Sequence, residues 1–241
     1  MKRRNFIVAS AASASLISAP QRSQAQTPTA FDPVKDWGFS PIVPIGDPFV
    51  AAPTGVKPPR HGEIATAFRI LYGSPRDVTP IDVARYLAAL PDKNEDGQRY
   101  SHEWPIDGRA NPLIVGFFSS TFTVPSLGDQ TSWCAAFLNF CLLAAGRQTT
   151  GSAQSGSFRN NKNYPETNSP SPGDIAVFKK TGPDGAKGFG HVAFYLSDDG
   201  ETIELLGGNQ VGSTNTTGAV TKTRLKYKSD ALELMSFRAV V

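Results

Sequence analysis

The sequence has little that could form a disulfide network, a metal site or a membrane span. Its 241 residues include only two cysteines and three histidines. No apolar run reaches the roughly 20 residues of a transmembrane helix, and no internal repeat indicates a solenoid. The histidines are scattered and both cysteines lie in one apolar segment, so no usual zinc-binding spacing can be assembled. We therefore expect no metal, no cofactor and no transmembrane span.

An excess of charge of one sign is also absent. Charged residues make up 19% of the chain, and the formal net charge is +3. Four of the 24 basic residues but none of the 21 acidic residues lie in residues 1–25, so the remainder has a net charge of −1. Because nucleic-acid binding needs a basic surface that displaces phosphate counterions, we expect no nucleic-acid partner. The hydrophobic content of 39% is enough for the core of one large domain.

The N-terminal segment has the features of an export signal. A basic head is followed by a weakly apolar stretch and by small residues near Ala25. Arg3 and Arg4, followed by Asn-Phe-Ile, resemble a twin-arginine signal. The alternative is an amphipathic helix that stays attached, but Pro20 would break such a helix. We expect residues 1–25 to be removed near Ala25 and the protein to be periplasmic or secreted.

Proline marks the next segment. Residues 26–60 hold eight prolines and show little periodicity, which is typical of an extended linker. Residues 61–241 would then form the folded domain with the candidate catalytic residues. The first half of this domain has helical patterns and the second half has short β-type runs. This order is typical of an α+β fold.

Two helices are predicted near the start of the domain. Apolar residues at helical spacing in Glu63–Leu71 place Ile64, Phe68 and Leu71 on one face. A second helix should begin after Thr79, which is a favourable N-cap before a proline and an aspartate in the first turn.

The remaining segments are mostly short. Pro112–Phe118 is apolar, and its period does not distinguish a helix from a strand. Gln148–Pro172 is a long polar stretch, and loops of this length in a domain are usually functional. Five β-type runs are separated by Gly, Asp and Lys turns: Asp174–Phe178, His191–Leu196, Thr202–Leu206, Lys222–Tyr227 and Leu234–Val240.

Both cysteines lie in one predicted helix. Trp133–Ala145 is apolar nearly all round, which indicates a buried helix, and Gly146 follows as its C-cap. Seven residues of helix separate the Cα atoms of Cys134 and Cys141 by about 10 Å. A disulfide needs less than about 7 Å, so both thiols should be free.

The two thiols differ in their position on this helix. Cys134 lies in the first turn, where unpaired backbone N–H groups and the helix dipole favour a thiolate. A thiolate is the form that acts as a nucleophile. Cys141 lies two turns further along and is interpreted as a small core residue.

A nucleophilic thiolate needs a basic partner, which is usually a histidine. His61 borders the linker and His102 lies in a polar loop, so both are most simply surface side chains. His191 follows Gly190 at the start of an alternating run, where a glycine permits another backbone to come close. From the spacing alone, His191 is equally well a catalytic base or a structural histidine.

A third group should orient the imidazole. The segment Leu205–Gln210 ends the next strand, and the end of the second strand of a hairpin lies beside the start of the first. Asn209 or Gln210 therefore falls near His191, although a simple Gly-Gly-Asn turn explains the segment equally well. Alternation along an extended strand favours Asn209, and a bulge at the two glycines would reverse that preference.

Four motifs occur in order along the domain: WCAAF from Trp133, SPGDIAVF from Ser171, GHVAFY from Gly190 and LGGNQ from Leu206. Together they resemble the CHAP-type cysteine peptidases and amidases, CHAP standing for cysteine, histidine-dependent amidohydrolase/peptidase. The resemblance covers roughly residues 79–241. It implies a papain-like α+β fold, in which the cysteine helix packs on a small antiparallel β-sheet, and cleavage of an amide bond in peptidoglycan.

By position, the resemblance implies that Cys134 is the nucleophile, His191 the base and Asn209 the orienting residue, with Gln210 as the alternate. Many CHAP domains place an acidic residue after the histidine strand, whereas this chain offers only amides there. The sequence thus predicts a thiol-dependent amidase or endopeptidase that cleaves peptidoglycan peptide through a cysteine acyl-enzyme. The alternative is a catalytically silent wall-binding or interaction module with the same fold.

Overall fold

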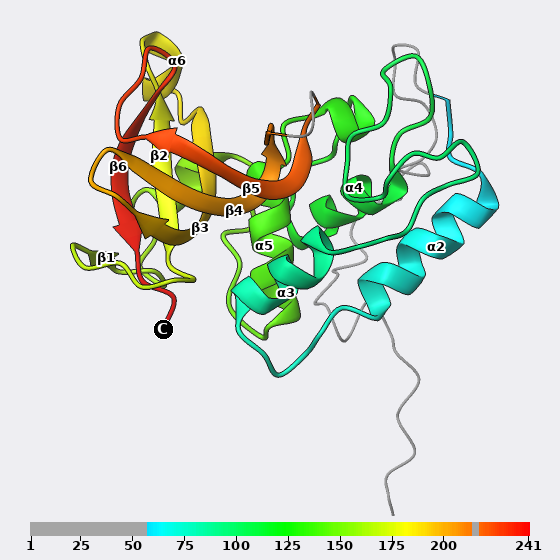
Figure 1. Cartoon of the computed structure of the whole chain (residues 1–241), viewed down its shortest axis with the longest axis horizontal. Coiled ribbons are helices and arrows are strands. Elements are labelled where there is room, and N and C mark those ends of the chain that lie inside the picture. The colour runs from blue at the N-terminus through cyan, green and yellow to red at the C-terminus, as the bar shows by residue number, and fades with distance from the viewer. Residues whose placement is uncertain (1–56, 214–216) are drawn as a thin grey trace, which may run out of the picture. The chain divides into compact units, whose positions relative to one another are not determined.

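The computed structural model describes residues 57–213 and 217–241 (Figure 1). The predicted export signal and residues 26–56 of the predicted linker lie outside the described residues. Every described residue belongs to one unit, Asp32–Val241. Helices occupy the first part of the described chain and a six-stranded sheet the second part, so the predicted α+β fold is confirmed.

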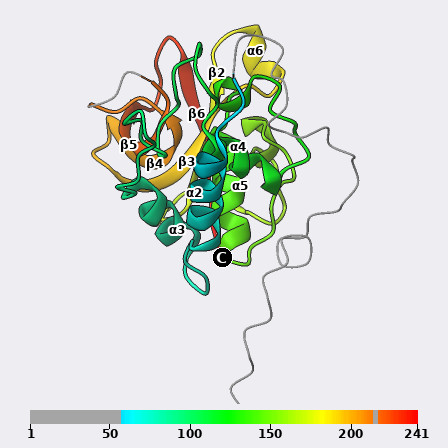
Figure 2. The ribbon, with the colours of Figure 1, turned by 90° about the vertical axis from the view of Figure 1, so that its right-hand side faces the viewer.

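The main helices of the described chain all precede the sheet: α2 (His61–Tyr72), α3 (Pro80–Ala88), α4 (Pro112–Phe117) and α5 (Cys134–Ala144). Figure 2 looks onto this helical side, with α2 toward the viewer. The segment that periodicity left open is the helix α4, because the Asn111 side chain caps it and accepts a hydrogen bond from Leu113 N at 2.9 Å. Shorter helical turns are η1 (Phe118–Ser120), η2 (Gly128–Gln130), η3 (Ser155–Phe158) and α6 (Pro183–Ala186).

The first two helices lie where the sequence predicts them, and α3 begins after Thr79. Ile64, Phe68 and Leu71 share one face of α2 as predicted and line one cavity against α4, although Phe68 is 54% exposed there. Glu63 on the same helix is also buried, and its carboxylate accepts hydrogen bonds from the Arg109 guanidinium at 2.8–3.0 Å. Its charge is thereby paired, as a buried carboxylate requires.

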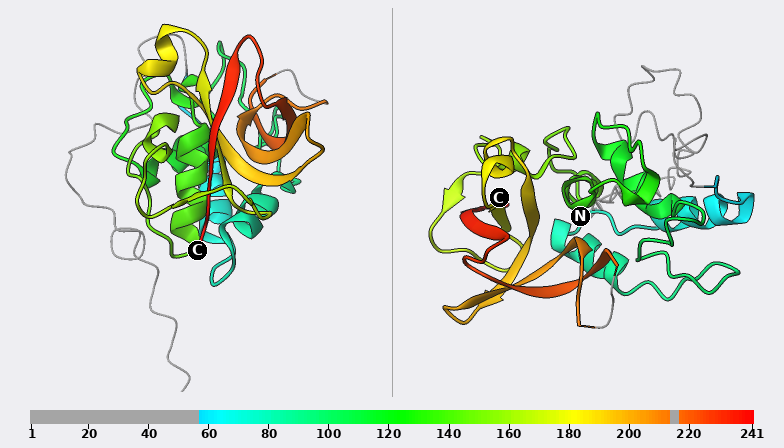
Figure 3. Two further views of the ribbon diagram at one scale, coloured as in Figure 1. Left: turned by 90° about the vertical axis from the view of Figure 1, so that its left-hand side faces the viewer. Right: turned by 90° about the horizontal axis from the view of Figure 1, so that it is seen from above.

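The six strands form one antiparallel sheet in the order β1-β6-β2-β3-β4-β5. Their bounds are β1 (Glu166–Thr167), β2 (Ile175–Lys180), β3 (Gly190–Asp198), β4 (Thr202–Gln210), β5 (Ala219–Lys226) and β6 (Leu232–Arg238). Five of them are the predicted strands with shifted ends. The short β1 lies within the predicted long loop and pairs with β6. Figure 3 shows how strongly the sheet twists between β6 and β5.

Helix α5 packs on the sheet as the resemblance implies. It contacts β3 and β4 on one side and α3 and α4 on the other. All its residues from Cys134 to Leu142 are buried, as its apolar surface predicts. Gly146 ends the helix with a φ of 70°, and its N–H donates to Leu143 O at 2.9 Å.

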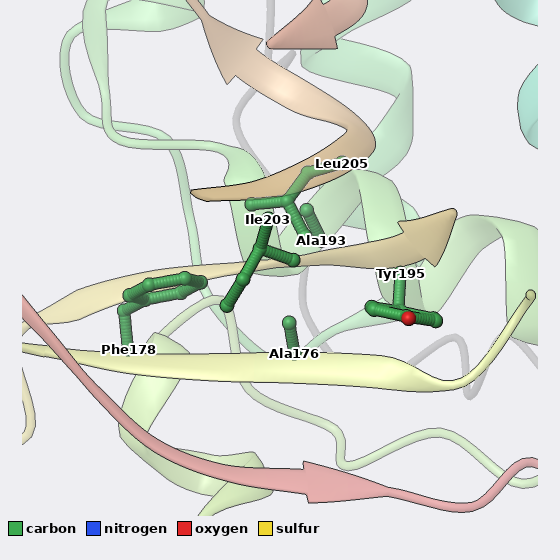
Figure 4. Close-up of a cluster of buried hydrophobic side chains, with 6 residues drawn as sticks. All are labelled: Ala176, Phe178, Ala193, Tyr195, Ile203 and Leu205. Atoms are coloured by element: carbon green, nitrogen blue, oxygen red, sulfur yellow. The ribbon is translucent and has the colours of Figure 1, made fainter. Parts of the chain in front are cut away.

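A second apolar cluster is built by the strands alone (Figure 4). It comprises Ala176, Phe178, Ala193, Tyr195, Ile203 and Leu205. Successive side chains of a strand point to opposite faces, so these alternate residues share one face of the sheet. Val192 and Phe194 consequently belong to the face that α5 covers.

The described chain contacts the domain from its first residue. Lys57 N donates to Gly108 O at 2.8 Å, and Arg60 N donates to the carboxylate of Glu63 at 2.7 Å. The last four residues of the predicted linker are therefore held against the domain. Among the described helices, none combines the length and apolar character that crossing a membrane requires.

Candidate active site

Cys134 is the first residue of α5 and is only 5% exposed. The backbone N–H groups of Val192 on β3, of Ala135 and of Cys134 itself lie near enough to the sulfur to favour its thiolate form. Because Val192 directly follows His191, the sulfur lies against the peptide link that joins these two residues. The structure thus brings the predicted nucleophile to the strand position of the predicted base.

A gap between β3 and β4 makes room for this contact. The β3–β4 ladder ends at the Phe194–Leu206 pair. The N–H of Tyr195 points to the other side, where it donates to the loop before β2 at 2.7 Å. Since N–H directions alternate along a strand, the N–H of Val192 points to the β4 side. Beyond the end of the ladder no carbonyl of the described strand β4 pairs with this N–H, and the sulfur of Cys134 lies near it instead.

Two glycines allow the backbones around the site to approach closely. A Cβ at Gly208 would lie 2.5 Å from Trp133 Cζ3 and 2.6 Å from Phe137 Cβ, so only glycine lets α5 press against β4 here. A Cβ at Gly190 would lie 1.9 Å from the carbonyl oxygen of Phe178 on β2. The close approach predicted for Gly190 is therefore confirmed.

An amide from β4 holds the imidazole of His191. Gln210 Nε2 lies 2.9 Å from His191 Nε2. The β4–β5 register shifts between Gly207 and Gln210, and Asn209 in this bulge has a φ of 55°. The preference for Asn209 assumes that side chains alternate regularly along an extended strand. The bulge interrupts this alternation, so the preference no longer holds. The Asn209 amide oxygen instead lies against Gly218, 2.5 Å from the position of a Cβ there.

The orientation of the Gln210 amide decides which nitrogen of His191 can act as a base. The oxygen and nitrogen of an amide are assigned from their hydrogen bonds. If the oxygen faces His191 Nε2, the imidazole keeps its proton on Nε2, and Nδ1 has a free lone pair. If the amide nitrogen donates to Nε2, the proton is on Nδ1. A base at Nδ1 therefore requires the Gln210 oxygen to face Nε2.

Burial controls the ionisation of both candidate groups. It raises the pKa of the Cys134 thiol, and the three backbone N–H groups that favour the thiolate do not cancel this effect. Burial also lowers the pKa of His191 to about 4. At neutral pH the pair is therefore a thiol and a neutral imidazole. The thiolate expected from the helix N-terminus is not the resting form, because desolvation outweighs the helix terminus.

The other cysteine and histidines do not join this group. Cys141 is fully buried inside α5, where burial raises its pKa well above the usual value. Both thiols are free, as predicted. His61 is exposed at the start of α2. His102, expected at the surface, is half-buried because it pairs with Ala219 at the start of β5, and burial lowers its pKa.

Sequence reasoning missed Glu103, which lies in the stretch assigned to a polar loop. Its Oε1 accepts a hydrogen bond from Trp133 Nε1 at 2.8 Å, and its Oε2 accepts one from Gly218 N at 3.0 Å. Trp133 immediately precedes Cys134, so this carboxylate supports the site from outside the four motifs. An isolated acid in a loop has no spacing that would mark it. In the part of the chain that the structure describes, no group of His, Cys, Asp and Glu side chains could hold a metal ion.

Comparison with known proteins adds one finding. Residues 126–209 match the family model described as CHAP domain. This range contains Cys134 and His191 and ends one residue before Gln210. No curated protein and no solved structure matches the chain. CHAP domains are cysteine- and histidine-dependent amidohydrolases or peptidases that generally act on peptidoglycan. Residues 126–209, with α5 packed on the antiparallel sheet in a papain-like α+β arrangement, are therefore a CHAP domain.

Proposed function

We propose that the protein hydrolyses an amide or peptide bond of peptidoglycan through an acyl-enzyme on Cys134. One observation carries this proposal. The backbone N–H of Val192, the residue after His191, lies near the Cys134 sulfur and favours its thiolate, and the His191 imidazole is hydrogen-bonded to Gln210 at 2.9 Å. A nucleophile, a base and an orienting group are thus contributed by α5, β3 and β4, in the chain order of a CHAP domain.

The reaction would proceed by acyl transfer. His191 takes the proton of the Cys134 thiol while the sulfur attacks the carbonyl carbon of the amide. The backbone N–H of Cys134 at the start of α5 stabilises the oxyanion. The tetrahedral intermediate then collapses, the C–N bond breaks, and the imidazolium protonates the leaving amine. Water attacks the thioester with His191 as base, which releases the acid and restores the thiol.

Gln210 would be the orienting residue in this mechanism. Its amide oxygen, facing His191 Nε2, keeps the Nε2 proton in place and stabilises the imidazolium that forms during attack. Asn209 would shape the bulge that aims Gln210, since its φ of 55° is a conformation that Asn tolerates better than most residues. Gln210, which the sequence offers as the alternate to Asn209, is therefore proposed as the direct partner of the base.

Mass spectrometry of muropeptides after incubation with the purified protein tests the proposed hydrolysis. New fragments that carry a free carboxyl and a free amine at one bond would identify an amidase or an endopeptidase. Cys134→Ala is the negative control and Cys141→Ala the matched control on the same helix. Fragments formed equally by wild type and Cys134→Ala would disprove the cysteine mechanism.

A catalytically silent wall-binding module is a second candidate, and the raised pKa of Cys134 and the lowered pKa of His191 favour it. A neutral thiol and a neutral imidazole are not charged for attack at rest. If this candidate is correct, the protein sediments with purified peptidoglycan and releases no fragments, and Cys134→Ala sediments equally.

We further propose that the protein reaches peptidoglycan by export. The proposal is supported by the basic head with Arg3 and Arg4, the weak apolar stretch and the small residues near Ala25. N-terminal sequencing of the exported protein should find a start near residue 26. Replacing both arginines by lysine should retain the precursor in the cytoplasm if the signal is of the twin-arginine type. Unchanged export would indicate a different route.

A further inference from the structure

We infer that Glu103 is a positioning residue of the proposed site. Its carboxylate joins Trp133, the residue before the nucleophile, to Gly218, beside the strand pair that holds the imidazole-orienting amide. The inference rests on the proposed function and extends the site to a residue outside the matched CHAP domain, residues 126–209.

The first oxygen of the carboxylate controls the start of α5. Trp133 is fully buried, and its ring lies between Phe117 and Phe137, with centroid distances of 6.1 and 6.4 Å. The only polar side-chain atom of the indole, Nε1, donates to Glu103 Oε1 at 2.8 Å. A carboxylate acceptor makes this a strong, oriented hydrogen bond. Because the Cα atoms of neighbouring residues are held about 3.8 Å apart, a shift of the Trp133 backbone would move Cys134.

The second oxygen controls the end of β4. Glu103 Oε2 accepts from Gly218 N at 3.0 Å, and Glu103 N donates back to Gly218 O at 2.8 Å. Gly218 precedes Ala219, which is the cross-strand partner of Gln210. A Cβ at Gly218 would lie 2.3 Å from Glu103 Oε1, so a glycine is required for the carboxylate to come this close. The Glu103 side chain therefore links the indole of the residue before Cys134 to the backbone beside the partner of Gln210.

The backbone around Glu103 is itself held in place. Val220 N donates to Ser101 O at 2.8 Å, and Trp104 N donates to Asp129 Oδ2 at 2.8 Å. Gln130 Nε2 donates to Trp104 O at 3.0 Å. These bonds attach the loop to β5 on one side and to the approach to α5 on the other. Glu103 is thus presented from a segment that hydrogen bonds hold on both sides, as a positioning group requires.

A purely structural role is the competing explanation, and the two differ in what a substitution changes. If Glu103 only stabilises the fold, its loss lowers the melting temperature and leaves the folded enzyme with normal turnover. Glu63 is a suitable comparison, because this buried carboxylate on α2 pairs with Arg109 at 2.8 Å and contacts none of the proposed site residues in these bonds.

The kinetic test compares Glu103→Gln with Glu63→Gln on a soluble stem-peptide amide, at a temperature where circular dichroism shows both folded. In Glu103→Gln an NH₂ group replaces one of the two carboxylate oxygens. The variant therefore loses the acceptor either for Gly218 N–H or for Trp133 Nε1–H. A misplaced nucleophile should lower kcat on the order of 10- to 100-fold. KM should stay within about two-fold, because substrate contacts are retained. Wild-type kcat in Glu103→Gln, or an equal loss in Glu63→Gln, would overturn the inference.

Trp133→Phe probes the same hydrogen bond from the other side. It removes the indole N–H and should lower kcat in the same way as Glu103→Gln. The kcat of the double variant should be little lower than that of either single variant, because the Glu103–Trp133 hydrogen bond is already lost or weakened in each of them. Fully additive losses would show that the two side chains act independently.

A second measurement separates this inference from the proposed function. Peptide mass mapping follows the alkylation of Cys134 by iodoacetamide in each folded variant. Loss of a hydrogen bond from Glu103 to Trp133 or Gly218 should make the buried thiol more accessible. Cys134 should therefore react faster in Glu103→Gln than in wild type or Glu63→Gln. If the wild type cleaves no substrate, the proposed function fails, and the alkylation rates alone decide on Glu103. Unchanged or slower labelling in Glu103→Gln would then overturn its positioning role.

Discussion

At the scale of single residues, the chemistry depends on how a buried thiol loses its proton. The pKa of Cys134 is raised and that of His191 is lowered to about 4, both by burial. A thiolate–imidazolium pair formed in advance would have to be stabilised in this desolvated place. We therefore expect the proton to move to His191 together with attack on the carbonyl, when Gln210 and the oxyanion donors can stabilise the charges. The Gln210 amide is important in such a mechanism, because it would stabilise the imidazolium as the charge forms.

The two cysteines should respond differently to alanine. Cys134→Ala should abolish hydrolysis and leave the protein folded, because it removes the nucleophile and deletes only one sulfur atom at the start of the helix. Cys141→Ala should keep most activity but lower the free energy of unfolding by about 1–2 kcal/mol, since it empties a fully buried position. Fragment release and urea denaturation measure the two effects. Equal activity in the two variants would contradict the assignment.

The amide that holds His191 can be identified by kinetics. Gln210→Ala should lower kcat and kcat/KM together, because the imidazole then loses its orientation in the chemical step. Asn209→Ala should have the smaller effect, since its amide lies at Gly218. This order follows from the 2.9 Å contact of Gln210 and reverses the order expected from strand alternation. A larger loss of kcat in Asn209→Ala would restore the original assignment.

At the scale of secondary-structure elements, the site depends on how closely α5 lies against β4. The helix is buried on all sides, so it is held between α3 and α4 and the strands β3 and β4. Its first turns meet the backbone of β4 at Gly208, where no side chain intervenes. Beyond the end of the β3–β4 ladder, this packing carries the sulfur to the N–H of Val192. A change of less than 1 Å in this packing would be felt at the reacting atoms.

Gly208→Ala tests this packing. The new methyl group would collide with Trp133 and Phe137 at 2.5–2.6 Å. We expect a loss of about 1–3 kcal/mol in the free energy of unfolding, together with a fall in kcat. Gly62→Ala is the control, because a Cβ at Gly62 meets nothing within 4 Å and alanine favours the helix α2. A Gly208→Ala variant as stable and active as Gly62→Ala would show that α5 can shift without consequence.

At the scale of the whole molecule, the helical segment before the CHAP domain is part of the fold. The Lys57–Gly108 hydrogen bond and the Glu63 carboxylate on Arg60 N fasten the start of the described chain. Glu103, in this segment, accepts hydrogen bonds from Trp133 beside the nucleophile and from Gly218. The segment is therefore expected to be needed for activity, although the family match begins only at residue 126.

The position of the N-terminal boundary can be tested by truncation. A chain that starts at Lys57 should melt like the longer protein and retain its activity. A chain that starts at His61 loses the contacts of Lys57 and Arg60, including the bond from Arg60 N to Glu63, and should be less stable by about 1 kcal/mol. Differential scanning calorimetry compares them. Identical melting would place the boundary of the linker at residue 60, as the sequence predicts.

Protonation of His191 should weaken the fold in acid. Its pKa is about 4 in the folded protein and 6.5 in an unfolded chain, so only the unfolded state binds the proton between these values. Stability from this group is complete above about pH 6.5 and declines as the pH falls to 4, by at most about 3 kcal/mol. Asp129 acts in the opposite direction, because burial raises its pKa to about 6.

The wild type and His191→Gln should be compared by urea denaturation at several pH values. The contribution of Asp129 is present in both proteins and cancels in their difference. The wild type should lose stability relative to His191→Gln as the pH falls from 6.5 to 4. A difference that does not change with pH would show that the imidazole titrates normally in the folded protein.

The sequence by itself determined the features that depend on neighbouring residues. Apolar periodicity and caps predicted α2, α3 and α5, and alternation predicted five strands, because these signals act within a few residues. The same local patterns placed Cys134 at a helix start and His191 at a strand start. They also excluded a disulfide, since the helix rise sets the distance between the two cysteines.

Only the tertiary structure decided what these residues meet. The bulge between Gly207 and Gln210 depends on pairing with β5, so alternation along β4 could not show which amide reaches His191. Glu63 pairs with Arg109 across 46 positions of the chain, and Glu103 meets Trp133 across 30 positions. The pKa of Cys134 follows the same rule: the helix terminus that favours a thiolate is visible in sequence, whereas the desolvation that outweighs it arises only when distant elements exclude water.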